Sequence, residues 1–115
     1  MALVVGVLMD PIAAIKIGKD STFAMLLEAQ RRGHRLRYAT DDTLAVRDGR
    51  AWAWLRDLQV RDDKAGWYEL GEPELVDLGG LDFFLARKDP PFDARFLHDT
   101  LVLDLAEQAG VRSDL

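Results

Sequence analysis

The chain has 115 residues, with 20 acidic and 15 basic side chains, a formal net charge of −5 and no cysteine. This length fits one domain, and the acidic balance excludes a general nucleic-acid binder, whose surface is basic. The absence of cysteine excludes disulfides, thiolate metal sites and a cysteine nucleophile. No signal segment and no apolar run of the roughly 20 residues that span a bilayer is found, so a cytoplasmic protein without membrane contact is expected.

The first part of the chain predicts a strand, a helix and a second strand. Residues 3–9 form an apolar run stopped by turn residues, which is typical of a strand buried on both faces. The helix is predicted to begin at Ser21 or Thr22, with Ser21 as its N-cap, and to end at Arg32. Residues 34–38 alternate as a strand does, and this spacing favours a parallel crossover.

An antiparallel hairpin is predicted in the middle of the chain. Two arms, residues 44–47 and 50–55, flank Asp48 and Gly49, a dipeptide that is the strongest short hairpin signal. The second arm is expected to run on toward Val60. The hairpin is therefore expected to lie between two strand–loop–helix units.

The last part repeats the strand–loop–helix order. Residues 66–70 predict a weaker strand, 72–80 a loop and 82–86 a short buried strand. A second helix is predicted over 94–109, capped by Asp93. The apolar face of this helix is expected to be its i+4 row with two further residues: Leu97, Leu101, Leu105, Phe96 and Leu103. The whole chain then reads as an α/β domain, with an open, mainly parallel sheet, flanking helices and an inserted antiparallel β-hairpin.

The two strand-to-helix loops, residues 10–19 and 87–93, are the candidate site. Loops at the carboxyl ends of strands line the ligand crevice of an open α/β sheet, and an arginine held there could bind a carboxylate in bidentate fashion. Two prolines stiffen the second loop. The charged residues of the two loops are Asp10, Lys16, Lys19, Arg87, Lys88 and Asp89. The alternative interpretation is that they are solvated charges and a helix cap.

No catalytic set or metal site is predicted. The glycine patterns of dinucleotide and phosphate loops and the Gly-x-Ser-x-Gly elbow do not occur. His34 and His98 stand alone, without a second histidine at ligand spacing. The aromatic residues that could stack on a ligand, but are favoured as a hydrophobic layer or subunit contact, are Trp52, Trp54, Trp67 and Tyr68.

Three stretches resemble a known family. They are MDPI at residues 9–12, KDSTFAMLLEAQRRGH at 19–34 and RKDPPFD at 87–93. In this order and separation they are similar to the start of bacterial glutathione synthetases, and the resemblance covers about residues 1–111. The sequence departs from the family at Gly18, where a second lysine is common.

The resemblance implies a pre-ATP-grasp, Rossmann-like N-terminal domain spanning residues 1–115. The family joins γ-glutamylcysteine to glycine with ATP and Mg²⁺ through an acyl phosphate, on an ATP-grasp fold that continues beyond this domain. The ATP-grasp domains, which hold the nucleotide and metal, are absent from the chain, so it is expected to bind neither and to be inactive alone. A homo-oligomer is also expected. Two alternatives stay open: a non-catalytic ligand-binding or dimerisation module, or the corresponding domain of another amino-acid ligase.

The resemblance also implies roles for loop residues. It places Asp10 and Lys19 in a first substrate-facing loop, and Arg87 and Lys88 in a second, with Arg87 as the ligand of a substrate carboxylate. The residues expected to shape or orient the loops are Pro11, Asp89, Pro90 and Pro91.

Overall fold

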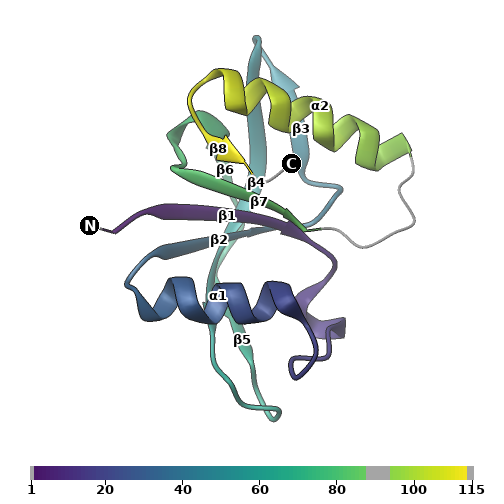
Figure 1. Ribbon diagram of the computed structural model, residues 1–115. Coiled ribbons are helices and arrows are strands. Elements are labelled where there is room, and N and C mark those ends of the chain that lie inside the picture. Colours follow the sequence, from purple (N-terminus) through teal and green to yellow (C-terminus); the bar gives the residue numbers. More distant parts are fainter. Residues whose placement is uncertain (1, 88–93, 114–115) are drawn as a thin grey trace.

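One mixed sheet with a helix on each face makes up residues 2–87 and 94–113, which are the residues that the computed structural model describes (Figure 1). In chain order the strands are β1 (Val4–Met9), β2 (Arg35–Ala39), β3 (Leu44–Arg47), β4 (Arg50–Val60), β5 (Tyr68–Leu70), β6 (Glu74–Asp77), β7 (Phe83–Arg87) and β8 (Arg112–Ser113). The helices are α1 (Ser21–Arg31) and α2 (Ala94–Gln108), with two short 3-10 turns, η1 (Ile12–Ala14) and η2 (Leu78–Gly80). None of the helices described combines the length and the apolar character that a bilayer crossing needs.

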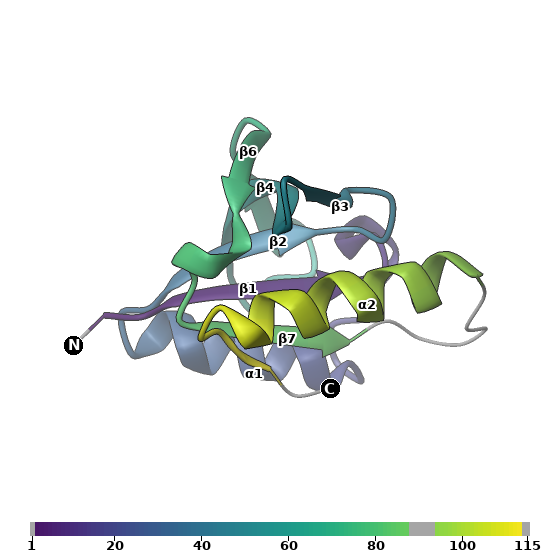
Figure 2. The same ribbon diagram turned by 90° about the horizontal axis from the view of Figure 1, so that it is seen from above.

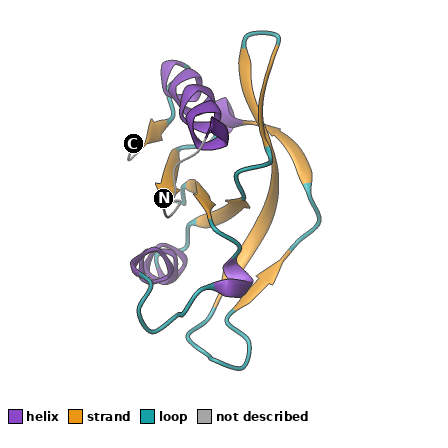
Figure 3. Ribbon diagram, turned by 90° about the vertical axis from the view of Figure 1, so that its right-hand side faces the viewer, coloured by secondary structure: helices purple, strands orange, loops and turns teal. Residues whose placement is uncertain are grey.

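The parallel part of the sheet has β1 at its centre. Strand β1 pairs in parallel with β2 on one side and with β7 on the other, and β8 adds a further parallel strand beside β7. Val7 and Met9 face α1, whereas Leu8 faces α2, and all three are buried. Figure 3 shows the two helices on opposite sides of these strands. Both faces of β1 are covered, so the prediction of a strand buried on both faces is confirmed, and so is the predicted α/β class.

The antiparallel part is built around β4, which is 11 residues long. The first half of β4 pairs with β3 and β6, and the second half pairs with β2 and β5. Figure 2 shows β3 and β6 beside β4, and Figure 3 shows this long strand curving along its length. Asp48 and Gly49 have φ of 53° and 73°, the positive values of a tight hairpin turn. The predicted hairpin and the extension of its second arm to Val60 are therefore confirmed.

The prediction of a loop over residues 72–80 is wrong. Residues 74–77 form β6, whose register aligns Trp54 with Leu75 and Ala53 with Val76, and η2 follows. The proline before this strand and the glycines after it are typical of a loop, so the sequence does not predict the strand. Pairing with the distant β4, not local composition, makes it extended.

The N-cap predicted for α1 is off by one residue. Asp20, in extended conformation, caps the helix: its carboxylate accepts a hydrogen bond from the Phe23 amide at 2.8 Å. Ser21 is the first helical residue, and its hydroxyl makes a contact with Arg87. Aspartate and serine cap equally well, so sequence alone does not choose between neighbours.

Helix α2 lies where it was predicted, but only part of its predicted apolar face is buried. Leu103 is buried and Leu105 packs half-buried on the core, as expected, whereas Leu97 and Leu101 are 61% and 63% exposed. Among the residues of the helix whose side chains the structure describes, the buried ones lie at i, i+3, i+4 and i+7 and include a charged residue: Asp99, Val102, Leu103 and Ala106. Because Asp99 is charged, the buried row does not show the continuous apolar periodicity that predicts a buried helix face. The predicted cap Asp93 and the side chain of Phe96 lie outside what the structure describes.

Candidate functional site

A cleft of about 330 Å³ opens where β1 and β7 end. It is lined by polar and charged residues from both strand ends and the start of α1, and we call it the first cleft: Asp10, Lys19, Asp20, Ser21, Thr22 and Arg87. The parallel register sets Met9 beside Arg87, so the ends of the two strands lie side by side. The structure therefore brings three of the candidate residues, Asp10, Lys19 and Arg87, together at one edge of the sheet.

The topology explains why the cleft lies there. From β1 the chain passes through α1 to β2 on one side, and from β7 it passes through α2 to β8 on the other. The strand order thus reverses between β1 and β7. In open α/β sheets the chain diverges above such a switch point and leaves a crevice for a ligand.

Arg87 is held against the start of α1. Its Nε donates to the hydroxyl of Thr22 at 3.3 Å, and its Nη2 donates to the hydroxyl of Ser21 at 3.2 Å. Thr22 is buried and Ser21 is exposed. A guanidinium positioned in this way is suited to bind a carboxylate, and the N-terminal amides of α1 add a favourable field for an anion. The sequence did not reveal this role for Thr22.

The first loop is anchored at Ile12, which is 1% exposed. The Ile12 amide donates to the Tyr38 hydroxyl at 3.2 Å, and the Ile12 carbonyl accepts from the indole of Trp67 at 2.9 Å. Burial raises the pKa of Tyr38 above its ordinary value. Tyr38 on β2 and Trp67, the residue before β5, therefore hold the loop that carries Asp10 and Lys19.

The remaining predicted site residues fall in three groups. Pro11 precedes η1 and directs the chain into that turn, with φ of −50°. Lys16 lines a neighbouring cleft instead of the first cleft. The four residues of the second loop that lie outside the described part are Lys88, Asp89, Pro90 and Pro91.

Each of the two histidines makes one contact with a backbone group that is distant in the chain. The Nδ1 of His34 accepts a hydrogen bond from the Leu3 amide at 3.0 Å, and the Nε2 of His98 lies 3.2 Å from the Leu44 carbonyl oxygen. Both contacts join structural elements. Within residues 2–87 and 94–113, no three histidine or carboxylate side chains converge as metal ligands would.

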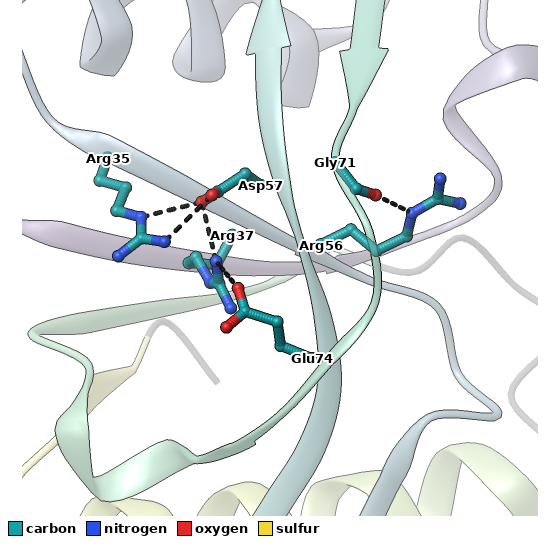
Figure 4. A network of polar contacts seen from close by, with 6 residues as sticks. All are labelled: Arg35, Arg37, Arg56, Asp57, Gly71 and Glu74. Carbon is teal, nitrogen blue, oxygen red and sulfur yellow. Dashed lines mark hydrogen bonds and ion pairs between the residues drawn. The ribbon is translucent and has the colours of Figure 1, made fainter.

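A second polar cluster joins β2, β4 and β6 (Figure 4). Asp57 accepts from Arg35 at 2.8 and 3.0 Å and from Arg37 at 2.8 Å, and Arg37 also donates to Glu74 at 3.1 Å. The Arg37 side chain is only 4% exposed. Hydrogen bonds from Arg35 in the first place, and from Arg37, lower the pKa of Asp57 to about 2. None of these residues lines the first cleft, and their ion pairs connect three strands of the sheet.

Comparison with known proteins agrees with the geometry. The family model for the prokaryotic glutathione synthetase N-terminal domain matches residues 3–113. The chain is 55% identical over 112 residues to a glutathione synthetase of Xanthomonas axonopodis pv. citri (strain 306), covering 97% of this chain and 35% of that protein. It is 52% identical to one of Xylella fastidiosa (strain Temecula1 / ATCC 700964), with 97% and 36% covered. One of Salmonella typhi is 49% identical over 105 residues, with 91% and 33% covered.

The matches have a clear extent. The chain spans about a third of the length of these curated relatives, and the matched part is almost the whole chain. The sheet, the switch point and the two loops all lie within the matched residues. The chain belongs to the family of prokaryotic glutathione synthetase N-terminal domains.

Proposed function

We propose that this chain is the peptide-substrate-binding domain of an ATP-dependent ligase that joins γ-glutamylcysteine to glycine. The observation that carries the proposal is the meeting of Asp10, Lys19 and Arg87 in one cleft at the switch point of the sheet. The names of the relatives, all glutathione synthetases, support the reaction class.

The charges of the first cleft fit the dipeptide. γ-Glutamylcysteine carries two carboxylates and one ammonium group. Arg87 is the proposed ligand of a carboxylate, and Lys19 supplies a second positive charge, with Lys88 as a further candidate from the second loop. Asp10 supplies negative charge, which orients the loop or faces the ammonium group. Asp89 and the prolines Pro11, Pro90 and Pro91 are proposed to shape the loops.

ATP and Mg²⁺ belong to the family's reaction, but the described residues do not fit either group. No carboxylate cluster for a metal occurs in the part of the chain that is described, and the phosphate-loop pattern is not in the sequence. We therefore assign nucleotide and metal to the parts of the full-length relatives beyond the match. The chain alone is then inactive, and a cytoplasmic location and a homo-oligomer complete the proposal.

The test is an NMR titration of the ¹⁵N-labelled chain with γ-glutamylcysteine and, separately, with ATP. We expect weak saturable shifts at the amides of Asp10, Ser21 and Arg87 with the dipeptide, and none with ATP. Arg87→Ala should weaken dipeptide binding by about tenfold, as expected for a lost charge-assisted hydrogen bond.

The matched control is Arg47→Ala, which removes the same charge from the exposed end of β3 and should leave binding unchanged. Equal affinity in the Arg87 and Arg47 variants would remove Arg87 from the site. Tight saturable ATP binding would overturn the assignment of the nucleotide to the parts beyond the match, and no dipeptide shift at all would favour a non-catalytic module.

A further inference from the structure

A second cleft, also of about 330 Å³, lies beside the first one. It is formed by the loop before α1 and the connection between β4 and β5, and its side chains combine positive charge with apolar surface: Ile15, Lys16, Ile17, Lys19, Lys64 and Trp67. It shares Ile15 and Lys19 with the first cleft. The other lining residues differ, so the two clefts present different chemistry.

Positive charge is concentrated in this second cleft. The chain has four lysines, Lys16, Lys19, Lys64 and Lys88, and three of them line it although the net charge is −5. None of the described residues that line it is acidic. Two neighbouring carboxylates are engaged with backbone amides: Asp20 accepts from Phe23 and Asp63 accepts from Ala65 at 2.9 Å. The charged side chains that line the second cleft are therefore all positive, which favours an anionic group in direct contact with them.

The apolar wall of the second cleft is a fixed aromatic ring. The indole of Trp67 is held by its 2.9 Å hydrogen bond to the Ile12 carbonyl, and its ring centroid lies 5.7 Å from that of Tyr68 at a 58° tilt. Ile15 and Ile17 are half-buried beside it. A preorganised aromatic ring with aliphatic neighbours suits a flat apolar group.

We propose that the second cleft is a binding site for an organic anion with a carboxylate or phosphate group on a flat apolar body. The anionic group lies between Lys16 and Lys64, and the body packs on Trp67. The first cleft differs because Asp10 and Asp20 line it and no aromatic residue does, so it suits a zwitterion. Because Lys19 lines both clefts, an occupant of the second cleft also lowers the affinity of the first for its own anion.

The experiment uses the full 115-residue chain and follows the Trp67 indole Nε1–H by ¹⁵N NMR, assigned with Trp67→Phe. The probes are phenyl phosphate, benzoate, inorganic phosphate and benzyl alcohol. Phenyl phosphate should give a saturable shift of the Trp67 indole and of the amides of residues 15–19. Benzoate should bind more weakly at the same place, because it carries less charge. Inorganic phosphate and benzyl alcohol should each bind at least about tenfold more weakly than phenyl phosphate. Inorganic phosphate lacks the aromatic ring that packs on Trp67, and benzyl alcohol lacks the anionic group.

Charge-removing variants locate the site. Lys16→Gln and Lys64→Gln should each weaken phenyl phosphate binding by about threefold, the effect of one exposed charge, and both together by about tenfold. Arg47→Gln is the control for net charge and should change nothing. All four lysine and arginine variants alter exposed residues, so the native spectrum is expected to persist.

Three results would overturn the proposal: no saturable shift of the Trp67 indole, an equal loss of binding in Arg47→Gln, or shifts confined to Ser21 and Arg87. Arg87→Ala separates this site from the proposed dipeptide site, because it should leave phenyl phosphate binding unchanged while it weakens γ-glutamylcysteine binding.

Discussion

Thr22 is the buried support of Arg87, and its removal tests how far the first cleft depends on positioning. Thr22→Val keeps the shape of the side chain but removes the hydroxyl that accepts from Arg87 Nε at 3.3 Å. We expect about fivefold weaker γ-glutamylcysteine binding, since a long hydrogen bond to a charged group contributes about 1 kcal/mol. The affinity is measured by NMR titration.

Thr22→Ser is the matched control, because it restores the hydroxyl and should restore the affinity. A merely structural role would lower the melting temperature without affecting the Arg87 side chain. The readout is therefore the Arg87 Nε–H resonance, which should exchange faster with water in the valine variant only. Full affinity in Thr22→Val would contradict a positioning role.

The same residues show what the sequence could predict of the site. Asp10 directly follows β1, Arg87 ends β7, and Lys19 lies in the loop from β1 to α1. Parallel strands bring their carboxyl ends to one edge, so the meeting of these residues in one cleft was predictable. Thr22 and Trp67 were not assigned to the site. Their roles depend on contacts with Arg87 and Ile12 that are far away in the chain and leave no local pattern.

At the scale of elements, α2 gives a direct test of which face is buried. Leu101 is 63% exposed, whereas Leu103, two residues on, is 1% exposed. Leu103→Ala should lower the free energy of unfolding by about 2–5 kcal/mol, because it leaves a cavity against the sheet. Leu101→Ala should change it by less than about 0.5 kcal/mol. Urea unfolding measures both, and equal losses would restore the face predicted from the leucine row.

Elements with a local signal were predictable, and the others were not. An apolar run predicts strand β1, and cap residues predict helix α1. A turn dipeptide at Asp48 and Gly49 predicts the hairpin. Strand β6 is short and lies between proline and glycines, and only its pairing with β4 makes it a strand. The buried face of α2 was predicted only in part, at Leu103 and Leu105, because Asp99 interrupts the apolar row that packs on the sheet.

At the scale of the whole molecule, the cluster around Arg37 joins the parallel and antiparallel parts of the sheet. Arg37 lies on β2, Asp57 on β4 and Glu74 on β6, so the two ion pairs connect three strands. The buried guanidinium has its charge compensated by these two carboxylates. Protonation of one carboxylate leaves the buried Arg37 cation with less compensating charge, which lowers the stability of the native state.

This arrangement predicts how stability changes in acid. The pKa of Asp57 falls from 3.8 to about 2 on folding, so its ionised form stabilises the native state above about pH 4. That stabilisation is lost as the pH falls from about 4 to about 2, because protons then bind the unfolded chain first and the native carboxyl last. The melting temperature of the chain should therefore drop steeply in this window.

Asp57→Asn isolates this contribution. The variant should be less stable than the parent at pH 7, and the difference in melting temperature should shrink as the pH falls to about 2 and below, because the parent carboxyl is half protonated at its native pKa of about 2 and neutral below it. The exposed Glu28–Arg31 pair on α1 is present in both proteins and cancels in the difference. Asp48→Asn removes an equal charge from the hairpin turn and should keep the parent's steep drop. A difference between Asp57→Asn and the parent that stays constant from pH 7 to pH 2 would show that the Arg35 and Arg37 contacts do not hold the sheet together through the charge of Asp57.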